Sequence, residues 1–287
     1  ELEKPIMIIP NLAIHMNRQV NEGVKINPQK DTLPLVTMLN DKLEKDNFLL
    51  ELIADNLHVE VENILDFELF LYSREKGSLI GLNEEFISVG RLDDLAMVHA
   101  GLYGLIHSKV GKGTNVLVCF DNEEVGSTTK QGAASPMLRT VLERITIAMG
   151  KDREDYYRAL SNSFLISADM AHALHPNYID KQDPTNRPVI NGGPAIKIAA
   201  SQSYTTDSLS SAIYEGICNS INIPVQKFVN RSDERGGSTI GPISSTQLDI
   251  PSVDIGNPIL AMHSIRELGG ILDHYYVYKS FKKFYEI

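Results

Sequence analysis

The sequence predicts an α/β protein whose sheet carries helices on both faces. Short apolar runs typical of strands alternate with longer segments of helical periodicity, which is the pattern of such layered folds. The clearest strand is Val-Leu-Val-Cys-Phe at residues 116–120, five apolar residues that we expect to be buried on both faces. Acidic residues follow this run at once, and ligands bind beyond the carboxyl ends of strands in open α/β sheets.

Other elements after residue 85 follow the same pattern. The spacing of apolar residues predicts helices at 92–108, 136–149 and 208–222, and a terminal helix that ends near residue 285. Apolar runs predict further strands at 164–168, 194–200, 224–229 and 253–255. The Gly, Ser and Thr residues of 231–241 predict a loop in which backbone can approach a ligand.

The residues before 85 read as a separate region. We expect an edge strand or covering segment at 5–14, a loop at 17–34, a helix at 49–57 and a strand at 63–73. Gly77, Gly81 and Asn83 interrupt the pattern, so we place a domain boundary there. The chain opens on Glu1 with a strand-like segment and no lead-in, and we expect the true N-terminus to be absent.

Composition excludes several classes of protein. A net charge of −10 without a cluster of lysine and arginine argues against nucleic acid or an anionic membrane as partner. No apolar run approaches the ~20 residues that span a bilayer. Cys119 and Cys218 are isolated, which indicates neither a disulfide framework nor a thiolate zinc site, and we expect Cys119 in the core. The predicted location is a reducing cytoplasm.

Glu123 and Glu124 stand side by side just after the predicted strand at 116–120. Two adjacent glutamates at the end of a buried strand are costly to bring together without cations, and a metal site is the simplest relief. The alternative is a solvated acidic turn.

Further candidate ligands lie at other strand ends and helix starts. Asp93 or Asp94 opens a predicted helix, Asp169 follows the strand at 164–168, and His263 follows the strand at 253–255. Each has an ordinary explanation by itself: a helix cap, a surface acid or a satisfied core histidine. Taken together, carboxylates and an imidazole at several strand ends indicate a metal centre.

Six motifs carry a resemblance to a known family. They are Arg-Leu-Asp-Asp at 91–94, Phe-Asp-Asn-Glu-Glu-Val-Gly-Ser at 120–127, Ser-Ala-Asp-Met-Ala-His-Ala at 167–173 with His-Pro-Asn-Tyr at 175–178, Gly-Pro-Ala-Ile-Lys at 193–197, Ser-Thr-Ile-Gly-Pro at 238–242 and Ala-Met-His-Ser-Ile-Arg-Glu at 261–267. In this order the sequence resembles the M18 metalloaminopeptidases, the aspartyl aminopeptidase family. The resemblance implies a three-layer α/β/α zinc-peptidase catalytic domain, with residues 85–287 as its C-terminal part and 1–84 as part of an inserted, β-rich dimerisation domain.

The same resemblance implies two zinc ions per full-length subunit, with other divalent metals as alternatives. Asp93 would bridge both ions, Glu124 and His263 would complete one, and Asp169 would serve the other. Glu123 would be the general base. A carboxylate that is not itself a ligand can take the proton of the attacking water and pass it to the leaving amine.

The implied assembly and substrate pocket follow from the family as well. In these enzymes the inserted domain forms dimers and donates a histidine, matched here by His15, to the neighbouring active site, and the dimers assemble into a tetrahedral dodecamer. His172, Lys197 and Tyr204 match positions that line the pocket. A lysine there suits an acidic N-terminal residue of a peptide, although an ordinary surface lysine is the alternative.

The sequence departs from the family in one respect. A further zinc ligand lies in a His-Thr-Asp motif upstream of the inserted domain, and these 287 residues contain no such motif. This puts the activity of these residues by themselves in doubt. Three other functions stay open: a degenerate relative that serves as an assembly or binding module, an aminopeptidase with broad or neutral preference, and another two-metal hydrolase such as a deacylase.

Overall fold

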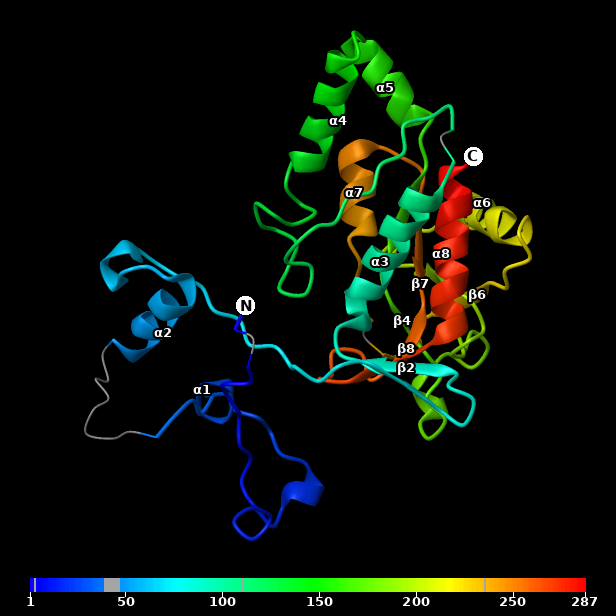
Figure 1. The fold of residues 1–287 in the computed structure, drawn as a ribbon. Coiled ribbons are helices and arrows are strands. Elements are labelled where there is room, and N and C mark those ends of the chain that lie inside the picture. Colours follow the sequence, from blue (N-terminus) through cyan, green and yellow to red (C-terminus); the bar gives the residue numbers. More distant parts are fainter. Residues whose placement is uncertain (3, 39–46, 110, 235) are drawn as a thin grey trace. The chain divides into compact units, whose positions relative to one another are not determined.

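The protein divides into two compact units, Glu1–Arg74 and Glu75–Ile287. Figure 1 shows the fold as a computed structural model, which describes residues 1–2, 4–38, 47–109, 111–234 and 236–287. The predicted sheet and the helices that cover it lie in the second unit, and each unit is described by itself.

The second unit contains two mixed sheets. The five-stranded sheet has the order β1 (Ser78–Ile80), β2 (Phe86–Val89), β9 (Glu267–Gly270), β8 (Pro258–Leu260), β4 (Ala171–His172). The four-stranded sheet has the order β3 (Leu165–Ala168), β7 (Ser252–Gly256), β5 (Ala195–Ile198), β6 (Gln226–Val229). Strand β7 pairs parallel with β3 and antiparallel with β5. All five residues of β7 are buried, as expected of a central strand.

Helices lie on both faces of the four-stranded sheet, which confirms the predicted α/β fold class. The main core joins Ile196, Val253 and Ile255 of the strands to apolar residues of three helices, α3 (Leu92–His107), α6 (Ser208–Asn219) and α8 (Ile271–Tyr285). A second cluster joins α4 (Met137–Ala148) and α7 (Gly241–Leu248) to the other face through Leu165. Helix α5 (Arg153–Ser161) follows α4, and the short 3-10 helix η3 spans Ile179–Lys181.

Local sequence explains where several helices begin. Asp152 and Asp207 each accept a hydrogen bond from the backbone three residues on, so α5 and α6 both start in a capping box.

Helix α3 places alanine and glycine on the side that faces α8, and a Cβ at Gly104 would lie 3.0 Å from Cβ of Phe281. The two helices therefore pack closely, as Figure 1 shows.

The predicted strand at residues 116–120 is wrong. The structure assigns no strand there, Val116 is 43% exposed, and Cys119 is exposed rather than in the core. Val118 and Phe120 pack against the cluster of α4 and α7 instead. An apolar run becomes a strand only where a neighbouring strand supplies partners for its N–H and C=O groups, and no described strand pairs with this segment.

The first unit holds fewer regular elements than expected. The helix predicted at 49–57 is confirmed as α2 (Phe48–Leu57). The segment predicted as a loop at 17–34 contains the short helices η1 (Val20–Glu22) and α1 (Pro28–Asp31), and residues 5–14 contribute only a bridge between Ile8 and Leu35. The strand predicted at 63–73 is wrong, because after η2 (Val61–Asn63) this stretch stays irregular and Leu65 is 96% exposed.

Residues 75–84 belong with the second unit. Strand β1 pairs with β2 in a hairpin, and Arg266 donates hydrogen bonds to the carbonyl of Lys76 and the hydroxyl of Ser78. The boundary between the compact units lies after Arg74. That 1–84 is part of an inserted dimerisation domain and 85–287 part of a catalytic domain stays a prediction.

Candidate metal centre

Four segments of the second unit bring the candidate ligands together. Asp93 lies in the first turn of α3, just after β2, and Asp169 directly follows β3. His263 lies in the loop between β8 and β9. Glu123 and Glu124 lie in the loop that follows residues 116–120. The expected position at the ends of strands therefore holds for Asp93, Asp169 and His263, whereas the two glutamates are carried by irregular backbone.

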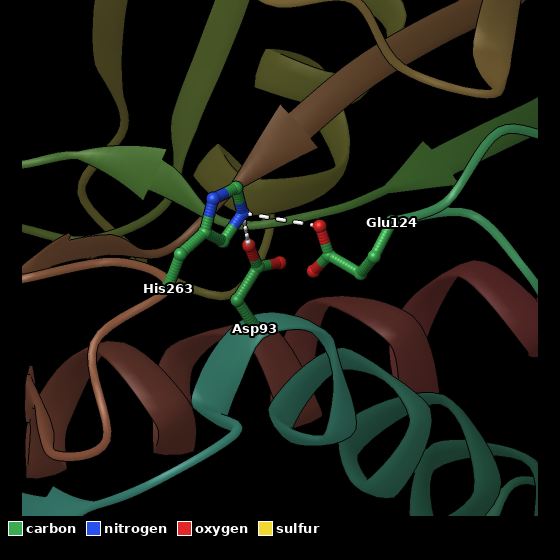
Figure 2. Close-up of side chains that lie close together, drawn as sticks. All are labelled: Asp93, Glu124 and His263. Carbon is green, nitrogen blue, oxygen red and sulfur yellow. Dashed lines mark hydrogen bonds and ion pairs between the residues drawn. The ribbon is translucent and has the colours of Figure 1, made fainter. Parts of the chain in front are cut away.

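Asp93, Glu124 and His263 point toward one another (Figure 2). Nε2 of His263 lies 3.0 Å from Oδ2 of Asp93 and 3.1 Å from Oε2 of Glu124. The Asp93 side chain is only 6% exposed, while those of Glu124 and His263 are 51% and 63% exposed. One side of this group is therefore held in the protein and the other is open to solvent.

A second group shares Asp93 and adds Asp94 and Asp169. One carboxylate oxygen from each lies within 4.8 Å of the others. Oδ2 of Asp169 accepts a hydrogen bond of 2.9 Å from Nζ of Lys197. The peptide bond between Asp93 and Asp94 is cis. Asp93 is thus common to both groups, which is the position expected of a bridging ligand.

Negative charge is crowded in this region. Burial, with the charges of Asp169 and Glu124, raises the pKa of Asp93 to about 8. Burial also raises the pKa of Asp94, together with the charges of Asp169 and Asp93. Burial and the charges of Asp169 and Glu124 raise the pKa of Glu123. Burial opposes the charge of Asp169, but Lys197 outweighs it and lowers the pKa of that carboxyl. The ammonium of Lys197 is therefore surrounded by more than one carboxylate, and it cannot neutralise all of them.

These residues fit a cation. Donor atoms about 3 Å apart, as in the group around His263, have the spacing of ligands on one ion, and carboxylate oxygen with imidazole nitrogen is a common donor set for zinc. Oδ1 of Asp94 is a buried acceptor without a hydrogen-bond partner. A positive ion would relieve both the crowded charge and this unpaired oxygen.

The backbone around the candidate ligands is unusual. Among the described residues, the non-glycine residues with positive φ include Arg91, Asn122, Ala261 and His263. Three of them lie two residues before a candidate ligand, and the fourth, His263, is itself a candidate ligand. Such conformations persist only where the surrounding structure enforces them, and they concentrate at functional sites.

Three residues predicted to bind substrate lie beside Asp169. Lys197 is 3% exposed, and its Nζ lies 5.6 Å from the centre of the Tyr204 ring. Phe228 contacts both the Tyr204 ring and the exposed His172 ring, with centroids 6.3 and 6.0 Å away. Lys197 is thus not the ordinary surface lysine of the alternative interpretation. His15 lies in the first unit, and its role in a substrate site stays a prediction.

Asp254 of β7 holds together the segments beside Lys197 and Tyr204. It is fully buried and accepts hydrogen bonds of 2.6 Å from the Thr205 amide and 2.8 Å from the Thr239 hydroxyl. A Cβ on Gly241, the first residue of α7, would lie 2.4 Å from its carboxylate. Asp254 therefore joins the turn that carries Tyr204 to the start of α7.

Sequence reasoning missed two residues of the site. Asp94 was expected only as an alternative to Asp93, yet it joins the second acidic group. Glu267 was named only as part of the motif at 261–267. It is 2% exposed, and its carboxylate accepts hydrogen bonds from the backbone amides of both Asp93 and His263. The acidic pair at 93–94 could have indicated the first, whereas nothing in the local sequence indicates the second.

A mixed α/β fold that gathers carboxylates and a histidine near its strand ends belongs to the class of proteins that can hold divalent metal ions at this place. A family model described as aminopeptidase I zinc metalloprotease (M18) matches residues 1–285. The chain therefore belongs to the M18 family.

Named relatives agree with this assignment. The chain is 65% identical over 286 residues to a "Probable M18 family aminopeptidase 2" of Clostridium novyi and 43% identical over 287 residues to one of Pseudomonas entomophila. All of this chain is matched in the first and 99% in the second, but it spans 66% of the length of either relative.

Solved structures share the fold. The structure of Ape4 in complex with Nbr1 superposes with a TM-score of 0.91 at 36% identity, covering 99% of this chain and 58% of that one. The S. cerevisiae mApe1 dodecamer superposes with a TM-score of 0.78 at 27% identity, covering 98% of this chain and 62% of that one. Within the described residues, no helix is both long enough and apolar enough to cross a membrane.

Proposed function

We propose that the full-length protein is a zinc-dependent aminopeptidase that removes N-terminal residues from peptides, with a preference for Asp and Glu. The observation that carries the proposal is the convergence of Asp93, Glu124, Asp169 and His263 in a chain of the M18 family. Two zinc ions per full-length subunit would be held by these residues together with ligands from the rest of the protein, and zinc supplies Lewis acidity at the scissile carbonyl.

Glu123 is the proposed general base. It adjoins the candidate ligand Glu124 but belongs to neither group of potential ligands, so its carboxylate is free to handle a proton. Burial and the charges of Asp169 and Glu124 raise its pKa, which brings it closer to the pKa that suits proton transfer near neutral pH. Glu123 would accept the proton of the attacking water and deliver it to the leaving amine.

Lys197 is the proposed determinant of the acidic preference. Its ammonium is buried beside Tyr204 and donates one hydrogen bond to Asp169. An ammonium has three N–H donors, so a carboxylate on the substrate could accept another. A buried cation next to a metal centre favours an anionic side chain over a neutral one because solvent screens their attraction only weakly. His172 and Tyr204 would form the walls of this pocket.

The proposed assembly is a homo-oligomer in which dimers form a tetrahedral dodecamer. One of the related structures is the dodecamer of S. cerevisiae mApe1. In the first unit, Ala54 is the only buried hydrophobic residue among those described, and side chains such as Met16 and Phe70 are 70% and 83% exposed. Such a surface needs a partner to cover it. His15, which lies in this unit, is proposed to reach the active site of the neighbouring subunit.

Turnover of chromogenic substrates with N-terminal Asp, Glu or Leu by the full-length, zinc-loaded protein tests the proposal. We expect hydrolysis of all three, with Asp and Glu preferred. Replacement of Lys197 by Met, which keeps the length of the stem, should remove the preference while Leu is still cleaved. Equal rates for the three substrates would indicate a broad aminopeptidase.

The other functions give different results in the same experiment. Cleavage of N-acyl amino acids but not of free-amine peptides would indicate a deacylase. No cleavage and no bound zinc would indicate an assembly module and would contradict the proposed function. A cytoplasmic location stays a prediction.

A further inference from the structure

Glu267, the first residue of β9, has contacts that reach two candidate ligands. Its Oε2 accepts a hydrogen bond of 3.1 Å from the backbone amide of Asp93, and its Oε1 accepts one of 2.7 Å from the amide of His263. Asp93 and His263 are 170 residues apart in the chain. Both carboxylate oxygens of Glu267 are therefore used on the backbone of residues whose side chains meet at the candidate metal centre.

The position of Glu267 follows from the pairing of two strands. It lies opposite Val89 at the end of β2, where the chain turns toward Asp93. At Gly90 an added Cβ would lie 2.7 Å from the carbonyl oxygen of Ile265, so the two loops approach backbone to backbone. The Glu267 carboxylate thus lies between the start of α3, which carries Asp93, and the loop that carries His263.

The negative charge of Glu267 suits this position better than a neutral amide would. A buried carboxylate is costly, and here it is stabilised by two backbone N–H donors. A glutamine of the same size has one acceptor oxygen, and its amide nitrogen would face an N–H donor instead of accepting from it. One of the two amides would then lose its partner, and the loop that carries it would lose its anchor.

We propose that Glu267 is a positioning residue of the metal centre, which sets the separation of Asp93 and His263 by fixing the backbone of both. The inference rests on the proposed zinc site and adds a residue that supports it. Partners behind the ligands of a metal usually matter for affinity by about 10-fold to 100-fold. Glu267 supports the backbone rather than the ligand atoms, so its loss changes how well two ligands are placed.

Asp273 offers a matched control. It is fully buried, and its carboxylate also accepts from two backbone amides, those of Asn191 and Gly193, at 2.6 and 2.7 Å. Neither of these amides belongs to a candidate ligand. Asp273→Asn therefore disturbs a carboxylate of the same kind in the same unit, but away from the metal centre.

The test is a zinc competition titration against a fluorescent chelator, with metal-stripped, full-length protein. Glu267→Gln should weaken zinc binding by about 10-fold to 100-fold. The zinc affinity of Asp273→Asn should stay within about twofold of that of the wild type, even if its unfolding midpoint falls as much as that of Glu267→Gln. Amide exchange in the metal-free protein gives a second readout. We expect faster exchange at Asp93 and His263 in Glu267→Gln, but not in Asp273→Asn.

Three results would overturn the inference. Equal zinc affinity in Glu267→Gln and Asp273→Asn would show that Glu267 has only a structural role. If Glu267→Gln fails to fold, Glu267→Asp replaces it: the shorter side chain cannot span both amides, so unchanged affinity in that variant is equally contrary. Failure of the wild type to bind zinc contradicts the proposed function and the inference together, whereas zinc binding that ignores Glu267 contradicts the inference alone.

Discussion

The two compact units differ in where their apolar side chains lie. The second, Glu75–Ile287, encloses a core in which Tyr214, Val253 and Val277 are fully buried. In the first, Glu1–Arg74, Ala54 is the only described hydrophobic residue that is buried, and Leu65 is 96% exposed. The second unit thus has a core that can hold a site rigid. The first has apolar surface that a partner is expected to cover.

This difference separates chemistry from assembly. The candidate ligands Asp93 and Asp169 lie at the ends of strands that the core supports, and their positions depend on elements within one unit. His15, which is proposed to reach a neighbouring subunit, lies in the unit without a core of its own. We therefore expect substitutions in the second unit to change turnover, metal binding or folding, and those in the first to change association.

The largest expected effect is that of Glu123→Gln on turnover. Removing a general base lowers the rate by about 100-fold to 10,000-fold, and because Glu123 is not among the potential ligands the bound zinc should remain. Steady-state kinetics and metal analysis of the full-length protein check both points. Loss of metal in this variant would show that the roles of Glu123 and Glu124 are exchanged.

Substitution of one phenylalanine in each unit tests how far packing in that unit contributes to stability. Phe281 of α8 is 5% exposed and Phe70 of the first unit is 83% exposed. Phe281→Ala should lower the free energy of unfolding by about 3–5 kcal/mol because it leaves a cavity in the core. Phe70→Ala should change it by less than about 0.5 kcal/mol at concentrations where the protein is monomeric. Chemical denaturation measures both, and similar losses would erase the contrast between the units.

Asp273 gives the core of the second unit a pH dependence. Burial raises its pKa from 3.8 to about 6, although the amides of Asn191 and Gly193 act in the other direction. Because the pKa of Asp273 is higher in the folded state than in the unfolded state, this group contributes most to the free energy of unfolding below pH 3.8. Its contribution is lost as the pH rises through 6. The difference is about 3 kcal/mol at most, at 1.36 kcal/mol per pKa unit. Stability of the wild type minus that of Asp273→Asn should fall between pH 4 and 7, and a constant difference would contradict the assignment.

The smallest expected effect is on association. Leu65→Ser in the first unit should raise the dissociation constant of the oligomer about tenfold, equivalent to ~1.4 kcal/mol. Leu82→Ser is the matched control, because Leu82 is fully exposed in the β1–β2 hairpin of the second unit. Sedimentation equilibrium compares them. Association that depends on Leu82 and not on Leu65 would move the proposed interface to the second unit.

Sequence reasoning succeeded where local pattern decides structure. The strand before Asp169, the buried strand at 253–255 and the helix that starts near Asp93 were all predicted, because each combines an apolar period with a clear end. These elements place three of the candidate ligands. The resemblance to the M18 family then supplied which side chains should meet.

The failures share a physical cause. The runs at 116–120 and 63–73 have the composition of strands but no described strand to pair with, and pairing is a property of the whole fold. Glu267 looks like any charged residue near the end of a loop, and only the pairing of β9 with β2 brings it to the amide of Asp93. Contacts between distant segments cannot be read from one stretch of sequence.

Anomalous scattering at the zinc edge, from crystals of the full-length protein, tests most directly whether distant acidic and imidazole side chains here hold metal. We predict one peak within bonding distance of Asp93, Glu124 and His263, and a second within bonding distance of Asp93 and Asp169. Zinc-soaked crystals with no peak between these side chains would contradict the account.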